Sequence, residues 1–405
     1  MSRVETTTNF RDNDGVDLGK KLITKDYLIS VYPSIGQQIG IPPELWTWGQ
    51  AGSGQLGENN TVTSKSTPVT TSAGGTNWKQ VSAGRETSAA IKSDGTLWTW
   101  GRNVVGQLGI NAGINRSTPV TTFAGGTNWK QVSSGGYLCA AIKTDGTLWT
   151  WGQGTYGQLG TNDTTQRRTP VTTFAGGTNW KQVSAGFRYC AAIKTDGTLW
   201  TWGRGADGQL GNNSTTNRST PVTTFAGETN WKQVSSGGYS CAAIKTDGTL
   251  WTWGSGSNGR LGTNDATQRN TPVTTFAGGT NWKQVSVGLR HCAAIKTDGT
   301  LWNWGLETSG QLGNNNNTSS PISTPVTTFA GGTNWKQVSV GSNYCAAIKT
   351  DGTLWAWGSN THGSMGTNDA GNLKLTPVTT FAGGTNWKQM SSGSSHIEAI
   401  KSVDF

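Results

Sequence analysis

From residue 45 to the end of the chain, apolar and polar positions repeat one pattern seven times. In L-W-T-W-G, the leucine and the tryptophans alternate, which places them on opposite faces of an extended strand. N-W-K-Q-V-S and x-C-A-A-I-K supply two more short strands in each unit. The segment T-P-V-T-T contains a proline, which favours an edge strand because proline cannot donate a ladder hydrogen bond. The sequence pattern therefore predicts four short strands in each unit.

The spacing of these units predicts the fold class. The period is 51 residues, extended to 52 or 53 at three joins, and a period near 50 residues is typical of propellers and solenoids. Between the second and third strands stands T-D-G-T, a strong hairpin signal. Four strands in each of seven units predict an all-β, seven-bladed β-propeller with four-stranded blades. The first tryptophan of L-W-x-W-G falls at Trp46, Trp98, Trp149, Trp200, Trp251, Trp302 and Trp355.

The two ends of the repeat region are complementary halves of one unit. The region opens with L-W-T-W-G at Leu45, which has no preceding A-I-K-T-D-G, and it closes with N-W-K-Q-M-S and A-I-K, which no L-W-x-W-G follows. We therefore expect residues 386–405 to pair with residues 45–77, which would close the ring and remove its open edges. A solenoid would instead need distinct capping repeats.

Residues 1–44 lie outside the repeat and are expected to form an N-terminal extended, anchoring segment, with the propeller spanning residues 45–405. Its first 16 residues are polar. An apolar cluster follows, in which Thr24 could cap a short helix that runs to Tyr32 and ends at Pro33. This cluster is the predicted anchor to a partner, and it consists of Leu22, Ile23, Tyr27, Leu28, Ile29, Val31 and Tyr32.

The net charge of +10 first suggests a nucleic-acid partner. Each repeat, however, carries one lysine in N-W-K-Q and one in A-I-K, and six repeats carry an aspartate in the hairpin. The excess is thus expected to be spread around the ring as a solvated surface, which argues against nucleic acid. No apolar run is long enough for a membrane span, and the N-terminus has no apolar signal region.

The cysteines and tryptophans, which could form reactive or binding sites, occur at fixed positions of the repeat. The five cysteines occupy one slot of an apolar strand and are expected to be buried free thiols, which fits a reducing cytoplasm. The 21 tryptophans amount to three per repeat, so we expect them to pack between blades rather than to stack on sugars. The three histidines are scattered, and there is no G-x-S-x-G element, phosphate-binding loop or metal-ligand spacing. The sequence predicts no enzyme activity, no cofactor and no metal.

The element W-G-x-x-x-x-G-Q-L-G, with a downstream S-x-G-x-x-H/Y-x-A-A-I, resembles the repeat of the regulator of chromosome condensation family over residues 45–405. The resemblance implies a seven-bladed propeller closed by both chain ends. Members include a guanine-nucleotide exchange factor and parts of ubiquitin ligases. The family often has histidine three residues after the glycine of S-x-G. Here the slot varies too freely for a shared catalytic position: Thr87, Leu138, Tyr189, Ser240, His291, Tyr344 and His396.

Two features of the sequence are not explained by the repeat and are therefore candidates for a functional role. The leader D-L-G-K-K-L-I-T-K-D-Y-L-I-S-V-Y-P is similar to leaders of propeller proteins among marine bacteriophage structural genes. The positions after S-x-G vary between repeats and are expected to share one face or the channel mouth, where arginine and aromatic side chains suit protein or glycan contacts. The residues predicted to bind a partner there are Arg85, Tyr137, Arg188, Tyr239, Arg290 and Asn343.

These observations lead to two hypotheses. The first is a non-enzymatic virion protein of a bacteriophage, assembled in the host cytoplasm. Residues 1–44 would anchor it to other virion proteins in a tail, neck or capsid, and the propeller would be displayed toward a host protein or glycan. The alternative is a cytoplasmic, protein-binding regulator that resembles the exchange factors, although no acidic insertion or protruding wedge suited to nucleotide exchange is present.

Overall fold

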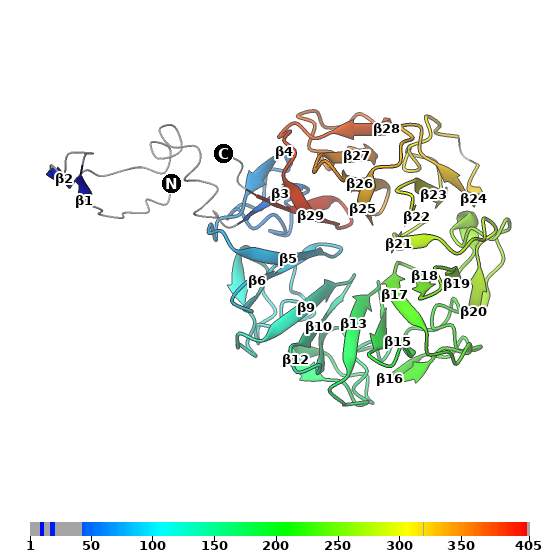
Figure 1. The fold of residues 1–405 in the computed structure, drawn as a ribbon. Coiled ribbons are helices and arrows are strands. Elements are labelled where there is room, and N and C mark those ends of the chain that lie inside the picture. Colours follow the sequence, from blue (N-terminus) through cyan, green and yellow to red (C-terminus); the bar gives the residue numbers. More distant parts are fainter. Residues whose placement is uncertain (1–8, 12–16, 21–42, 319, 403–405) are drawn as a thin grey trace.

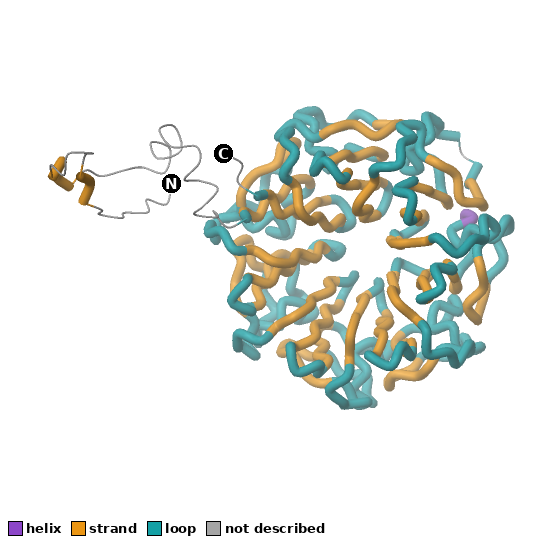
Figure 2. The backbone as a smooth tube through the Cα atoms, viewed as in Figure 1, coloured by secondary structure: helices purple, strands orange, loops and turns teal. Residues whose placement is uncertain are grey.

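Seven four-stranded antiparallel sheets stand around a central axis in the computed structural model, which describes residues 9–11, 17–20, 43–318 and 320–402 (Figure 1). The predicted all-β, seven-bladed propeller is therefore confirmed. Strands and loops make up almost all of the described chain, and one 3-10 turn, η1 (Ser257–Gly259), interrupts a loop (Figure 2). Ahead of the ring, β1 (Asn9–Arg11) and β2 (Asp17–Lys20) pair as a small antiparallel hairpin.

Within each blade, the strands are counted from the channel outward. Blade 1 consists of β5 to β8, blades 2 to 6 follow in chain order, and blade 7 contains β29, β30, β3 and β4. The first strands are β5 (Trp78–Ala83), β9 (Trp129–Ser134), β13 (Trp180–Ala185), β17 (Trp231–Ser236), β21 (Trp282–Val287), β25 (Trp335–Val340) and β29 (Trp387–Ser392). The second strands are β6 (Thr87–Lys92), β10 (Leu138–Lys143), β14 (Tyr189–Lys194), β18 (Ser240–Lys245), β22 (His291–Lys296), β26 (Tyr344–Lys349) and β30 (His396–Lys401).

The outer half of each blade follows the same order. The third strands are β7 (Leu97–Gly101), β11 (Leu148–Gly152), β15 (Leu199–Gly203), β19 (Leu250–Gly254), β23 (Leu301–Gly305), β27 (Leu354–Gly358) and β3 (Glu44–Gly49). The fourth strands are β8 (Arg116–Thr121), β12 (Arg167–Thr172), β16 (Arg218–Thr223), β20 (Arg269–Thr274), β24 (Ile322–Thr327), β28 (Lys374–Thr379) and β4 (Lys65–Thr70), and each carries the proline predicted for an edge strand.

Blade 7 is built from both ends of the propeller, in the order β29-β30-β3-β4. The register pairs Leu45 with Ile400 and Gly49 with His396, as adjacent strands pair within the other blades. The predicted closure of the ring is therefore confirmed. The pairing of β30 with β3 leaves neither of these strands with an unpaired edge.

The hydrophobic core lies between blades, and the third strand faces both neighbouring interfaces. In blade 2, Leu148 packs into the cluster shared with blade 3, whereas Trp151 packs into the cluster shared with blade 1. Opposite faces for leucine and tryptophan are what the alternation predicts. Trp129 meets Trp149 and Trp151 edge to face, with ring centroids 6.0 and 6.4 Å apart, and equivalent pairs recur around the ring. The tryptophans are packing residues, as predicted.

A belt of side-chain hydrogen bonds joins the first strands around the channel. Gln131 Nε2 donates to the Val183 carbonyl at 3.0 Å, and the Val183 amide donates back to Gln131 Oε1 at 2.9 Å. Two positions later, the Ala185 amide donates to Ser133 Oγ at 3.0 Å. The amide-to-glutamine and amide-to-serine bonds recur at all seven interfaces, including the one between blades 7 and 1. The belt therefore fixes neighbouring blades at the same height.

Candidate functional site

The two faces of the disc carry different basic residues. Every first strand begins at the face where the second strand ends in lysine, and Trp129 pairs with Lys143 at this end in blade 2. We call it the lysine face. The first strands end at the opposite face, where the S-x-G loops lie, and we call that face the arginine face.

Closely packed glycines place the variable residues of the arginine face side by side. A Cβ added at Gly135 would lie 2.3 Å from the carbonyl oxygen of Gly186 in the next blade, so only glycine allows this approach. The amide of Gly136 then donates to the same carbonyl at 3.1 Å, and the amide of Phe187 donates to Gly237 at 3.1 Å. The glycine of S-x-G thus joins adjacent loops, and the two variable residues that follow it surround the channel mouth.

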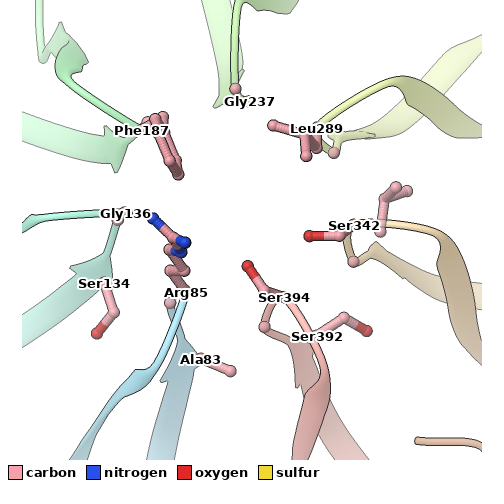
Figure 3. A pocket seen from close by; sticks show the side chains of 18 of the residues that line it. Ala83, Arg85, Ser134, Gly136, Phe187, Gly237, Leu289, Ser342, Ser392 and Ser394 are labelled. Carbon is pink, nitrogen blue, oxygen red and sulfur yellow. The ribbon is translucent and has the colours of Figure 1, made fainter. Parts of the chain in front are cut away.

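The mouth holds a cavity of about 400 Å³, which the variable residues surround. Figure 3 shows Arg85 and Phe187 on one side of the opening and Leu289, Ser342 and Ser394 around the rest of it. The first of the two variable positions lines this mouth in every blade, whereas four of the predicted residues lie on the same face without lining the cavity: Tyr137, Arg188, Arg290 and Asn343. The ring is sevenfold in its scaffold but asymmetric in its lining, because the positions after S-x-G contribute large side chains in blades 1, 3, 4 and 5 and only small ones in blades 2, 6 and 7.

An arginine–aromatic cluster begins over blades 1 to 3. The guanidinium of Arg85 lies 5.4 Å from the ring centroids of both Tyr137 and Phe187, and its Nη1 donates to the Tyr137 hydroxyl. Tyr137 and Phe187 meet edge to face at 5.1 Å. Arg188 lies 5.3 Å from the Tyr137 ring and 5.2 Å from the Tyr156 ring. Each such cation–π contact contributes about 0.5–1 kcal/mol at an exposed site.

The cluster continues to blade 4 through Tyr239. This ring lies 6.4 Å from Phe187 and is approached by Arg204 at 5.8 Å and by Arg260 at 5.6 Å. Arg260 is buried, and burial lowers the pKa of its guanidinium. We define the arginine–aromatic patch as Arg85, Glu86, Arg102, Tyr137, Tyr156, Phe187, Arg188, Arg204, Asp207, Tyr239 and Arg260.

Two acids hold three of these arginines in place. Glu86 Oε2 accepts from Arg102 Nη1 at 2.8 Å, and Glu86 Oε1 lies 3.6 Å from Arg85 Nε. Asp207 pairs with Arg204. The other two arginines of the patch have no ion pair among the described residues, so the patch keeps a net positive charge. Its aromatic side chains are half-buried.

Four of the six predicted partner-binding residues of the propeller face belong to this patch. Arg85, Tyr137, Arg188 and Tyr239 do so, whereas Arg290 and Asn343 stand over blades 5 and 6 with no ring contact among the described residues. The anchor residues predicted in the leader lie outside the described residues. Tyr156, Arg204 and Arg260 belong to a second variable set that follows W-G. The sequence alone favours ordinary surface variation for this set, and the structure brings the three residues into the patch.

The slot that holds histidine in many family members is structural in this chain. All seven of its side chains are buried. Tyr189 donates through its hydroxyl to the Ser240 carbonyl of the next blade at 2.6 Å, and His396 Nε2 lies 3.0 Å from Ser88 Oγ. Burial lowers the pKa of His291 to about 3 and that of His396 to about 4, so both imidazoles are neutral at pH 7. These side chains fill the interfaces between blades.

The lysines recur in every blade, so the charge excess is spread around the ring, as the sequence predicts. The structure adds that every N-W-K-Q lysine and every A-I-K lysine lies on the same face of the disc. The A-I-K lysines lie over tryptophan rings, for example Lys143 at 4.4 Å from the Trp149 centroid. The N-W-K-Q lysines are exposed and form what we call the lysine ring: Lys79, Lys130, Lys181, Lys232, Lys283, Lys336 and Lys388.

The part of the chain that the structure describes contains no group of three or more His, Cys, Asp or Glu side chains placed to hold a metal ion. The five cysteines are buried and unpaired, as predicted. Burial raises the pKa of the Cys139 thiol to about 12. Within the described ranges, no helix has the length and apolar character that a membrane span requires.

Family models match most of the propeller. The model described as the RCC1-like domain matches residues 43–327. Two models of the regulator of chromosome condensation (RCC1) repeat match residues 335–364 and 351–400.

Individual proteins give the same result. The chain is 31% identical to the ultraviolet-B receptor UVR8 of Arabidopsis thaliana, over 80% of this chain and 74% of that protein. It is 27% identical to the human E3 ubiquitin-protein ligase HERC2 over 88% of this chain, which spans only 8% of that ligase. The structure of yeast RCC1 (Prp20), solved with Kap60 bound, superposes with a TM-score of 0.78 at 19% identity, covering 89% of each chain, and shows likeness of fold alone.

Proposed function

Because the chain belongs to the family of proteins built on the RCC1-like domain, we propose that it is a non-catalytic regulator that binds another protein through the arginine–aromatic patch. The observation that carries this proposal is the asymmetry of the arginine face. The scaffold repeats in every blade, whereas tyrosine, phenylalanine and arginine gather over four of them. These residue types are enriched at the energetic centres of protein interfaces.

The geometry of the patch supports a protein partner over a glycan. A sugar needs the open face of an aromatic ring. The Tyr137 ring is instead approached by Arg85 and Arg188, and the Tyr239 ring by Arg204 and Arg260. Guanidinium groups that are held against rings are preorganised to receive carboxylates and carbonyl oxygens, because less side-chain entropy is lost on binding. We therefore expect an acidic or carbonyl-rich surface on the partner.

The chain provides a matched pair of variants for a test. Arg188 and Arg290 occupy the same slot of their repeats, and only Arg188 contacts the aromatic rings. The full-length protein, R188A and R290A are used to capture proteins from the cells in which the protein occurs, and the captured partner is then titrated in purified form. We expect R188A to weaken binding about tenfold or more, which is about 1.4 kcal/mol. R290A should change binding less than about twofold.

Equal affinities for the two variants would contradict the proposal, provided that circular dichroism shows both to be folded. A glycan that binds the wild type, and loses binding in Y137A and Y239A, would replace the protein partner with a sugar. Acceleration of nucleotide release from a small GTPase would narrow the proposal to an exchange factor.

The bacteriophage virion role is a finer hypothesis that rests on the layout of a leader followed by a disc, on the absence of a reaction centre in the sequence pattern, and on the resemblance of the leader. If residues 1–44 anchor the disc to other virion proteins, deletion of residues 1–40 should leave a folded propeller that no longer joins its assembly. Normal assembly of the truncated protein would rule out that role. The arginine–aromatic patch is independent of the leader, so the protein-binding proposal does not depend on this outcome.

A further inference from the structure

The mouth of the channel at the lysine face has the features of a second binding site. The first strands of adjacent blades pack against each other all around the axis, so the lysine ring encircles the channel. Lys79, Lys283, Lys336 and Lys388 line a cavity of about 590 Å³ at this mouth. Cavities of 300–1,000 Å³ are typical of small-molecule sites.

The lysine ring is not neutralised within the described part of the chain. None of its seven ammonium groups forms an ion pair there, although Lys245 of the neighbouring A-I-K set pairs with Glu228. The hairpin aspartates of the same face interact electrostatically with the A-I-K lysines, as Asp145 does with Lys143, rather than with the lysine ring. Asp145 Oδ1 also accepts from the amide of Thr147 at 2.9 Å and from its hydroxyl at 2.7 Å. Like charges around one opening repel each other, and a bound anion would remove that repulsion.

The floor of the cavity adds hydrogen-bond donors. Gln284 and Gln337 line it, and the belt uses one Nε2 hydrogen of each, in bonds to Val338 and Met390. A primary amide carries two such hydrogens. Each glutamine therefore has a second N–H with no partner among the described residues, close to the lysines. Neutral donors below a ring of ammonium groups suit an anion with several oxygen atoms.

From this arrangement we propose that the lysine ring binds a compact anion bearing several phosphate groups, one per propeller, on the channel axis. The residue types distinguish this ligand from macromolecules. Lysine is depleted at protein interfaces, where arginine and aromatic residues are enriched, and the patch on the opposite face has the latter composition. Single-stranded nucleic acid needs exposed aromatic rings on which bases stack. On the lysine face, exposed phenylalanines such as Phe123 lie in the loops that leave the outermost strands, and none of them lines the cavity. Beside the cavity, Trp78 is buried, and Lys92 lies over the Trp78 and Trp98 rings.

Isothermal titration calorimetry of the full-length protein tests this proposal. The probes are inositol hexakisphosphate and inorganic hexametaphosphate, with inorganic monophosphate, a short oligothymidine and a hexaglutamate peptide as comparators. We expect both multivalent phosphates to bind with a stoichiometry of one, and monophosphate to bind far more weakly. Binding should weaken as ionic strength rises, because the contacts are electrostatic.

Two double variants with the same loss of charge locate the site. K283Q/K336Q removes two charges that line the cavity, and R168Q/R218Q removes two exposed charges from fourth-strand positions at the rim. We expect the first to weaken hexametaphosphate binding about tenfold or more and the second less than about twofold. The absence of saturable binding, equal effects of the two double variants, or tighter binding of oligothymidine or hexaglutamate would each overturn the proposal. Thermal unfolding without ligand confirms that both variants fold.

Discussion

At the scale of single residues, the informative positions are those where one repeat departs from the other six. Glu307 is such a departure. In two other blades the same slot holds Asn103 or Asn360, whose side-chain oxygens accept the backbone amides of Leu108 and Met365 at 2.9 Å. Glu307 is fully buried, and the penalty of burying its carboxylate outweighs the weak interaction of this group with the backbone amide of Leu312, the equivalent donor in this blade. Burial raises the pKa of this carboxyl to about 8.

This raised pKa makes the stability of the propeller depend on pH. The folded state favours the protonated carboxyl, so the stability present below about pH 4.5 is lost as pH rises toward 8. Glu307→Gln keeps the size and removes the titration. We expect it to raise the Tm by about 2–4 °C at pH 8 and to leave the Tm nearly unchanged at pH 4.5. Thermal unfolding of both proteins at the two pH values measures this, and an equal gain at both would contradict the titration.

Residues of the arginine–aromatic patch differ in how well the sequence predicts them. Arg85, Tyr137, Arg188 and Tyr239 follow S-x-G, a slot whose variability is visible from an alignment of the repeats with one another. Their mutual contacts are not visible in the same way. Arg260 replaces the glutamine of G-Q-L-G and reaches the Tyr239 ring from a different loop of the same blade, and only the folding of blade 4 brings the two together.

At the scale of elements, the first strands determine how blades join. Each interface combines a tryptophan cluster with a glutamine and a serine of the belt, and the sequence predicts the cluster but not the belt. The pattern N-W-K-Q marks Trp282 as buried and Gln284 as polar. It does not reveal that Gln284 bonds both the amide and the carbonyl of Val338 in the next blade, at 3.1 Å each.

The belt leads to a prediction about Gln284. Gln284→Leu leaves the amide and carbonyl of Val338 without these partners, which costs about 1–3 kcal/mol for a buried group that loses its hydrogen bond. We expect a lower Tm and faster hydrogen exchange at Val338. Gln268→Leu is the control, because Gln268 is exposed and its side chain bonds only Asn270 among the described residues. Its effect should stay within about 0.5 kcal/mol.

If Gln284→Leu and Gln268→Leu unfold at the same temperature, the belt does not contribute to the joining of blades. In that case the tryptophan clusters alone would hold adjacent sheets together, with their rings 6.0–6.5 Å apart.

At the scale of the whole molecule, the period of the sequence predicts the seven blades and their closure, because both depend on which residues recur. The distribution of charge is a different matter. Counted along the chain, the lysines are evenly spaced, which suggests an even surface. In a closed ring, residues at equivalent positions of each repeat lie at the same height on the disc. These lysines therefore lie together on one face. The chemistry of a repeat protein is therefore better predicted by face than by sequence segment.

The molecule thus separates two kinds of surface. The arginine face carries an asymmetric patch, which suits one orientation of a protein partner. The lysine face carries a sevenfold ring of charge, which suits a compact anion on the axis. The channel between them is lined by the belt, whose glutamines and serines are the same in every blade.

The central claim is that the protein partner binds the arginine–aromatic patch, and hydrogen–deuterium exchange of the full-length protein with and without that partner tests it most directly. We predict slower exchange in the loops that contain Arg85, Tyr137 and Arg188, and unchanged exchange in the loop that contains Asn343 in blade 6. The claim would be contradicted if protection were confined to the leader or the lysine face, or were equal in all seven S-x-G loops.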